Sequence, residues 1–461
     1  MKKKLNIISA FAALTVLIFA GKTADAQFDL TLYNLKPVIQ TNLANPAFIP
    51  EFQYHVGVPA LSSLYMGEGT SGVKFNQLFN KRADDSLVFD FTTIVDKVKK
   101  KNNISMSSGV QWLNGGMKWK DYYFTLSISD YFNMSMFYSD DLVKLAVNGN
   151  AQYIGQNMNI DPTYLKATHY REYAFGAAWD FDSQWNFGAK AKMLFGKSNI
   201  RTKTLDAQLY TADNTYYLTS ETNMLINTSI PQSWTDSDGG VKFNSDYLFY
   251  GGSFGLSVDL GATYKLDEQF SFSASVLDLG YIRFDRNYAN FSNDNVKWTF
   301  EGIDALAFTD MTNDQVNDEL KYIGDSLVKK FDIKESWERY DVMMTAKIYL
   351  GGTYKLSDIE TVGALVRSEI VDKNWRPSLT LSYYRQILDE LGVIGSYTII
   401  NRSYTNIGAG VYYNYAPVQV YLVTDNIVGL FVPDAVKYAN VHFGINLYLP
   451  ASKSGDALIE F

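Results

Sequence analysis

Several segments of this chain alternate apolar and polar residues with the period of two that is typical of β-strands. The pattern is clearest in residues 185–195, 256–266, 270–276 and 441–449. In the first segment, one face carries Trp185, Phe187 and Met193, and the opposite face carries Lys190 and Lys192. Strands of about 9 to 11 residues can cross a bilayer when tilted, whereas soluble strands usually have about 5 to 6 residues. The pattern therefore predicts membrane-spanning β-strands.

The connections between these segments support a barrel. Tight polar turns occur at Lys120-Asp121, Asp182-Ser183-Gln184, Asp267-Glu268-Gln269, Ser357-Asp358-Ile359, Leu388-Asp389-Glu390 and Tyr415-Ala416-Pro417. Longer and less regular stretches lie between them, at about residues 139–164, 231–252, 285–338 and 425–437. Because barrels of outer membranes have short turns at one end and longer loops at the other, we predict an all-β fold. It is an up-and-down antiparallel transmembrane β-barrel of about 14 strands, within a range of about 12 to 16.

Three segments interrupt the β pattern and predict short helices in loops or in the lumen. They are residues 92–102, 140–147 and 312–331. In the last of these, Thr312 and Gln315 have the spacing of a capping box, and apolar residues recur at helical intervals. The resulting apolar stripe could pack on the barrel mouth, enter the lumen or dock a partner.

Composition agrees with a membrane barrel and excludes several kinds of site. Aromatic residues make up 15% of the chain, yet no apolar run after the N-terminus is long enough for a membrane helix. A soluble β-sandwich or propeller is the alternative on composition alone, and the strand length favours the barrel. Cysteine is absent and histidine occurs only three times, so we expect no disulfide, no metal site and no cofactor.

The N-terminus has the features of a secretory signal peptide. Three lysines precede an apolar stretch from Leu5 to Ala20, and Ala24 and Ala26 provide a cleavage site after Ala26. An uncleaved membrane anchor is the alternative, although the apolar stretch is shorter than the ~20 residues that span a bilayer. We therefore expect a signal peptide at 1–26, an N-terminal segment at 27–50 and a barrel at 51–461, located in the outer membrane after export. Cleavage would change the net charge from −8 to −11, by removal of four Lys and one Asp, which argues against nucleic acid as a partner.

Two resemblances refine this interpretation. The tripeptide Asn45-Pro46-Ala47 is similar to an element near the mature N-terminus of FadL-type and PorV-type barrels. The segments 278–284, 384–386 and 424–427 resemble an uncharacterised family of Bacteroidota outer-membrane barrels. The resemblance implies location and fold. By analogy with FadL-type proteins, residues 27–50 would form a hatch that plugs the lumen, with Asn45, Pro46 and Ala47 as hatch residues. An ordinary extension that leads into the first strand is the alternative.

The leading functional hypothesis is transport or binding of a hydrophobic or amphipathic small molecule, which predicts an apolar pocket behind the hatch or a gap in the wall. The alternative is a non-transporting component of a cell-surface or secretion assembly, with a protein partner besides the membrane lipid. We expect no enzyme, because no motif frames a nucleophile or base. The candidate lumen-lining residues are Lys190, Lys192, Asp259, Lys265 and His442. His442 is expected to point into the lumen as a hydrogen-bonded structural histidine.

Overall fold

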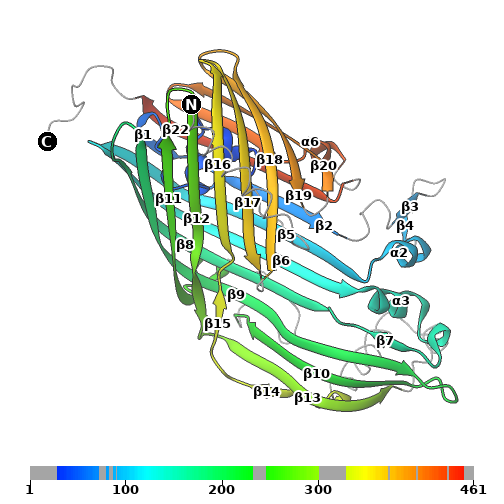
Figure 1. The fold of residues 1–461 in the computed structure, drawn as a ribbon. Helices are drawn as coiled ribbons and strands as arrows, with labels where there is room; N and C mark the ends of the chain where they lie inside the picture. Colours follow the sequence, from blue (N-terminus) through cyan, green and yellow to red (C-terminus); the bar gives the residue numbers. More distant parts are fainter. Residues whose placement is uncertain are drawn as a thin grey trace.

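The computed structural model is a closed antiparallel β-barrel of 14 strands, as the strand pattern predicts (Figure 1). The structure describes residues 29–71, 79–81, 87–89, 91–231, 246–300, 329–371, 374–400, 403–432 and 436–450. The predicted signal peptide lies outside the described residues. In order around the wall, the strands are β1 with β2 (Phe52–Gly57, Leu64–Thr70), β5 (Lys101–Trp119), β6 (Tyr122–Ser139), β8 (Tyr164–Asp180), β9 (Trp185–Thr211), β11 (Ser253–Lys265), β12 (Phe270–Phe284), β15 with β16 (Tyr340–Met343, Ala346–Ser357), β17 (Glu360–Val371), β18 (Asn374–Gln386), β19 (Leu391–Ile400), β20 (Ser403–Tyr415), β21 (Val418–Thr424) and β22 (Tyr438–Pro450).

The first and last wall strands close the barrel. Both β1 and β2 pair with β22 on one side and with β5 on the other, so these two short strands together form one wall strand. Residues 58–63 separate them and bulge out of the pairing. Ile445 N donates to Leu61 O across this bulge at 2.8 Å, and Val58 N donates to Ile445 O at 3.0 Å. The wall is therefore hydrogen-bonded through the bulge.

The wall has an apolar outer face and a polar inner face. On β11, the side chains of Leu256 and Leu260 are 49% and 50% exposed, whereas that of Asp259 between them is 1% exposed. Exposed aromatic residues lie beside the short turns, for example Trp119 and Trp185. An apolar outer band with aromatic residues near its edge is what a lipid-facing barrel presents. The alternation in the sequence thus correctly predicts which face is buried. No helix in the described part of the chain is long and apolar enough to span a membrane.

The six tight turns predicted from the sequence are confirmed, since each joins two neighbouring wall strands. At the opposite end the prediction of long irregular loops is partly wrong. β9 has 27 residues and extends past the wall, where it pairs with β10 (Leu218–Ser229) and β7 (Asn157–Asn159). β13 (Tyr288–Phe300) pairs with β10, and β14 (Lys334–Ser336) pairs with β13. These strands are stabilised by pairing with the extension of β9, which no local pattern reveals (Figure 1).

Two further connections at this end are short rather than long. β17 ends at Val371 and β18 begins at Asn374, and β20 begins at Ser403 after β19 ends at Ile400. The rhythm of short and long connections therefore holds for only part of the barrel.

The helices are short, as predicted. α3 (Asp140–Asn148) confirms the helix expected at 140–147, and Ser139 Oγ caps it by accepting from Leu142 N at 3.1 Å. α2 (Phe91–Lys97) is shorter than the predicted 92–102, because β5 begins at Lys101. Most of the predicted helix 312–331 lies outside the described residues. The remaining elements are α4 (Asp246–Phe249), α6 (Ile427–Phe431), η1 (Leu32–Asn34), η2 (Ile39–Leu43), η4 (Ala151–Tyr153), β3 (Phe79–Lys81) and β4 (Leu87–Phe89).

Residues 29–50, here called the lumen segment, lie inside the barrel and contain η1 and η2 but no strand (Figure 1). One apolar cluster joins Leu30, Tyr33 and Ala44 of the segment to Leu277, Tyr349, Leu365, Ile400 and Tyr438 of the wall. A second cluster joins Leu32, Leu35 and Val38 to Ile394, Tyr412, Tyr421 and Val423. Irregular backbone can persist at membrane depth only where protein shields it, and these contacts provide that shield.

Candidate functional site

The Asn45-Pro46-Ala47 tripeptide is packed against β9, β11 and β12. Asn45 Oδ1 accepts a hydrogen bond from Ala47 N at 2.9 Å, which closes a tight turn. Asn45 Nδ2 donates to the carbonyl oxygen of Ala274 at 3.3 Å and to Tyr33 Oη at 3.4 Å. Asn45 is fully buried. The tripeptide therefore makes hydrogen bonds both within the lumen segment and to the wall.

Glycines in the wall make this close approach possible. A Cβ at Gly188 would lie 2.3 Å from the carbonyl group of Pro46, and a Cβ at Gly261 would lie 2.1 Å from Asn45 Oδ1. Both distances are far shorter than van der Waals contact. Gly188 on β9 and Gly261 on β11 thus form a shallow seat for the tripeptide.

The Gly188→Ala substitution is expected to loosen the lumen segment, because its Cβ would overlap backbone atoms that cannot rotate away. Ion conductance across planar bilayers, measured on the purified protein, should rise above the wild-type level. Overpacking of this kind typically costs about 1–3 kcal/mol of stability. Gly395→Ala is the matched control, since a Cβ there meets no atom within 4 Å. Equal conductance in the two variants would contradict the proposed seat.

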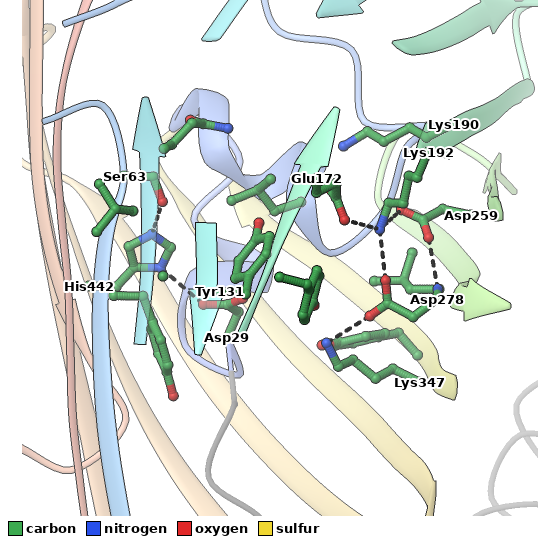
Figure 2. A pocket seen from close by; sticks show the side chains of 18 residues that line it. Asp29, Ser63, Tyr131, Glu172, Lys190, Lys192, Asp259, Asp278, Lys347 and His442 are labelled. Carbon is green, nitrogen blue, oxygen red and sulfur yellow. Dashed lines mark hydrogen bonds and ion pairs between the residues drawn. The ribbon is translucent and has the colours of Figure 1, made fainter. Parts of the chain in front are cut away.

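A cluster of buried charges lies on the wall beside the lumen segment (Figure 2). This ionic cluster consists of Glu172, Lys192, Asp259, Asp278 and Lys347. Lys192 Nζ lies 2.7 Å from Asp259, 2.8 Å from Asp278 and 3.3 Å from Glu172. Lys347 Nζ lies 2.9 Å from Asp278. The five residues come from five neighbouring wall strands, β8, β9, β11, β12 and β16, so barrel closure and strand register bring them together.

A β-bulge in β12 places Asp278 in the cluster. The register against β11 shifts between Val258 and Leu260, and Asp278 has a left-handed φ of 61°. Its backbone N–H donates to Asp259 Oδ1 at 2.8 Å. Leu277 and Asp278 are consequently both buried, although they are consecutive in a strand. An extra residue at a bulge re-aims a side chain in this way.

The structure places four of the five candidate lumen-lining residues around one cavity. Lys190, Lys192, Asp259 and His442 border one cavity, whereas Lys265 is exposed at the end of β11 beside a short turn. Lys190 Nζ donates to the carbonyl oxygen of Asn42 in the lumen segment at 2.7 Å. It has no ion-pair partner among the described residues. Lys190 is therefore a buried cation whose only described partner is a peptide carbonyl.

The cavity has a volume of about 50 Å³ and lies between Leu43 of the lumen segment and the wall. Its lining includes the ionic cluster, Lys190, several tyrosines and Asp29 (Figure 2). A second cavity of about 20 Å³ shares Leu43, Lys190 and Gln111 with it. The expectation of an apolar pocket behind the N-terminal segment is wrong for this cavity. Inward-facing acids and lysines line it, and the apolar wall residues on the other side are already covered by the lumen segment.

A chain of hydrogen bonds crosses the other side of the same cavity. Ser63 Oγ lies 2.7 Å from His442 Nε2, and His442 Nδ1 lies 2.9 Å from Asp29 Oδ1. Ser63 precedes β2, His442 lies on β22 and Asp29 is the first described residue of the lumen segment. His442 is thus hydrogen-bonded on both ring nitrogens at this cavity, and the sequence did not predict its two partners.

Asp425, in the turn that follows β21, anchors the start of the lumen segment. Its Oδ1 accepts from Thr31 N at 2.7 Å, and its Oδ2 accepts from Asn440 Nδ2 at 2.8 Å. Thr31 Oγ1 also lies 2.7 Å from Ser396 Oγ on β19. Burial raises the pKa of the Asp425 carboxyl to about 6, despite the hydrogen bonds that favour its charged form.

Sequence reasoning missed Glu172, Asp278 and Lys347 of the ionic cluster. Glu172 sits in an aromatic-rich strand between Arg171 and Tyr173, where alternation does not single it out. The side chain of Asp278 is positioned by a bulge, and Lys347 follows a break between β15 and β16. Their shared position depends on pairing between strands that are far apart in the chain.

A family model described as "Family of unknown function (DUF5723)" matches residues 46–425. The chain belongs to this family. The match covers most of the barrel of this DUF5723 member and begins within the Asn-Pro-Ala tripeptide. None of the curated proteins compared with the chain matches it.

Solved structures of transporters are similar in outline. The toluene transporter TodX of Pseudomonas putida aligns with a TM-score of 0.41 and 10% identity, over 93% of this chain and 94% of TodX. The toluene transporter TbuX of Ralstonia pickettii aligns with a TM-score of 0.42 and 10% identity, over 93% and 97% of the two chains. A FadL homologue of Pseudomonas aeruginosa aligns with a TM-score of 0.40 and 9% identity, over 94% and 100%. Similarity at this level does not indicate a substrate for the DUF5723 chain.

Proposed function

We propose that this DUF5723 protein resides in the outer membrane and transports a small amphipathic molecule that carries a charged group. The lumen segment closes the barrel between transport events. The apolar outer face, the aromatic residues beside the turns and the polar inner face support a membrane location. Of the hydrophobic and amphipathic molecules expected from the sequence, we favour the amphipathic class.

The observation that carries this proposal is the two-sided surface that the lumen segment covers. The segment rests on apolar wall residues such as Leu365, Ile394 and Ile400 through Leu30, Leu32, Leu35 and Val38. Its opposite side meets Lys190 and borders the cavity with the ionic cluster. A molecule that takes the place of the segment would therefore meet apolar side chains on one side and charges on the other. An amphipathic molecule satisfies both.

Lys190 is the residue best placed to bind an anionic group of that molecule. Asn42 O is its described hydrogen-bond acceptor, and a peptide carbonyl carries only a partial negative charge. A carboxylate or phosphate would form a stronger, charge-assisted hydrogen bond with the ammonium group. Displacement of the segment by an anionic amphiphile would therefore give Lys190 a stronger hydrogen-bond acceptor.

Uptake into proteoliposomes tests the proposal. A fluorescent fatty acid or another anionic amphiphile is expected to enter faster than into protein-free liposomes, whereas a neutral sugar of similar mass is not. The Lys190→Gln variant should slow uptake of the anion by about tenfold or more, because loss of one charge-assisted hydrogen bond costs about 1.5–3 kcal/mol. Lys265→Gln is the matched control, because Lys265 is exposed outside the cavity. Uptake of the anion at the protein-free rate, or equal loss in both variants, would contradict the proposal.

A further inference from the structure

We propose that Ser63, His442 and Asp29 form a catalytic group of the serine-hydrolase type, which cleaves a carboxylic ester at the lumen cavity. This activity goes beyond transport and rests on a separate set of residues. It also departs from the expectation, drawn from the absence of a sequence motif, that the protein is no enzyme. Triads of this kind are recognised by geometry and roles, because their members can come from any order along the chain.

The hydrogen bonds have the polarity that the chemistry requires. Asp29 Oδ1 lies 2.9 Å from His442 Nδ1, and a carboxylate can only accept, so this nitrogen carries the proton. In the neutral imidazole the lone pair is then on Nε2, which lies 2.7 Å from Ser63 Oγ. The hydroxyl of Ser63 therefore donates to the base. Ser63 thus contacts Nε2, the nitrogen that acts as the base, and Asp29 contacts Nδ1, the nitrogen that carries the proton (Figure 2).

The imidazole is held in place by aromatic rings. The ring of Tyr65 meets that of His442 at a centroid distance of 5.7 Å and an angle of 80°. The ring of Tyr421 meets it at 5.5 Å and 69°. Ser63 is held as well, because its carbonyl oxygen accepts from Gln111 N at 2.9 Å. The nucleophile and the base thus have little freedom to move apart.

Gln111 is placed to stabilise the oxyanion. Its side chain is buried and borders the same cavity as Ser63. Its Oε1 accepts from Ser62 Oγ at 3.1 Å, whereas its Nε2 donates to no atom of the described residues. A fixed amide donor beside the nucleophile is a common element of oxyanion holes.

The reaction balances as the hydrolysis of an ester. Ser63 Oγ attacks the carbonyl carbon and passes its proton to His442 Nε2, and the carbonyl electron pair moves to the oxygen near Gln111. The intermediate expels the alcohol, which takes the proton from His442, and the acyl group remains on Ser63. Water then attacks the acyl carbon and gives a proton to His442. The bond between the acyl carbon and Ser63 Oγ breaks, the carboxylic acid is released, and Ser63 Oγ takes the proton back from His442. Asp29 is a positioning residue that stabilises the imidazolium.

The cavity has room for the water that the second step needs. A volume of about 50 Å³ exceeds the ~30 Å³ that one water molecule takes up in the liquid. The side chain of Leu43, which is only partly buried, borders the cavity on the side of the lumen segment. An ester group reaches Ser63 by displacing this side chain. Lys190 lies on the same cavity and would stabilise the carboxylate product.

Covalent labelling of the full-length protein in mild detergent tests the inference. A small fluorophosphonate is expected to form one adduct, with the Ser63 Oγ–phosphorus bond replacing the phosphorus–fluorine bond. Intact mass and peptide mapping would identify the site. The rate should fall at least about tenfold in His442→Gln, since general-base catalysis contributes about 10²–10⁴-fold. Asp29→Asn should also lower the rate, and Asp29→Glu should recover part of it.

The controls separate catalysis from a structural role. Ser257 is a buried serine on β11 whose Oγ has no hydrogen-bond partner among the described residues, so Ser257→Ala should leave labelling unchanged. Heat-dependent gel migration shows whether each variant folds. Because the adduct is mapped on the wild-type protein, the test does not depend on the folding of Ser63→Ala. No adduct on the folded wild-type protein, or labelling of Ser63 at the same rate in His442→Gln, would overturn the inference.

Discussion

In the Thr31→Cys/Ser396→Cys variant, uptake of the amphiphile is expected to fall to the protein-free rate after oxidation and to recover with reductant. The hydroxyl oxygens of the two residues lie 2.7 Å apart, so cysteines at these positions are close enough to bond. Since the chain contains no cysteine, the pair would supply the only thiols. The disulfide would fix the start of the lumen segment to β19, and transport that needs the segment to move would stop.

A second cysteine pair controls for effects of the disulfide itself. Thr380 Oγ1 and Thr398 Oγ1 lie 2.9 Å apart on the neighbouring wall strands β18 and β19. The Thr380→Cys/Thr398→Cys variant would carry a similar bond in the wall but leave the lumen segment free. Its uptake should not change on oxidation. Continued uptake in the fully oxidised Thr31→Cys/Ser396→Cys variant would show that the segment does not need to leave its place.

The Lys192→Met substitution is expected to destabilise the barrel by about 3–5 kcal/mol, the typical cost of removing one partner of a buried ion pair. Lys192 contacts three carboxylates, and removing it would leave Glu172 and Asp259 without an ion-pair partner among the described residues. Both are buried. The folded fraction at increasing urea, read from unheated gels of the protein in detergent, measures the effect.

An exposed ion pair provides the comparison for this prediction. Lys297 Nζ lies 3.5 Å from Glu221, and both side chains are largely exposed. Lys297→Met should therefore change stability by only about 0–1 kcal/mol. The double variant Lys192→Met/Asp259→Leu should be more stable than Lys192→Met, because one unpaired carboxylate is gone. If Lys192→Met unfolded at the same urea concentration as Lys297→Met, the ionic cluster would have no special role.

The sequence predicts the barrel well because the needed information is local. The positions of Leu256, Asp259 and Leu260 on opposite faces follow from alternation alone, and the tight turns follow from short polar stretches between strands. The sheet formed by β10 and β13 was not predicted, because residues 288–300 have no clear alternation. They form a strand because β9 continues past the wall. Its extension pairs with β10, and the free edge of β10 pairs with β13.

The lumen site was predicted only in part. Lys190, Lys192, Asp259 and His442 were identified because they alternate with apolar neighbours in regular strands. Asp278 lies at a bulge, where alternation fails. Ser63 is the last residue of the break between β1 and β2, and Asp29 lies in the irregular lumen segment. No periodicity marks either residue as a partner of His442.

By itself, the sequence determined the fold class, the strand faces and the tight turns of this protein. Each depends on residues within one strand or one hairpin. The tertiary structure alone decided which charges meet, because the ionic cluster requires the register of five strands. It also decided that Ser63, His442 and Asp29 share one cavity, since closure of β1 and β2 against β22 and the position of the lumen segment bring these distant residues together. Contacts of this kind depend on how the chain closes on itself, and a pattern along the sequence does not contain that information.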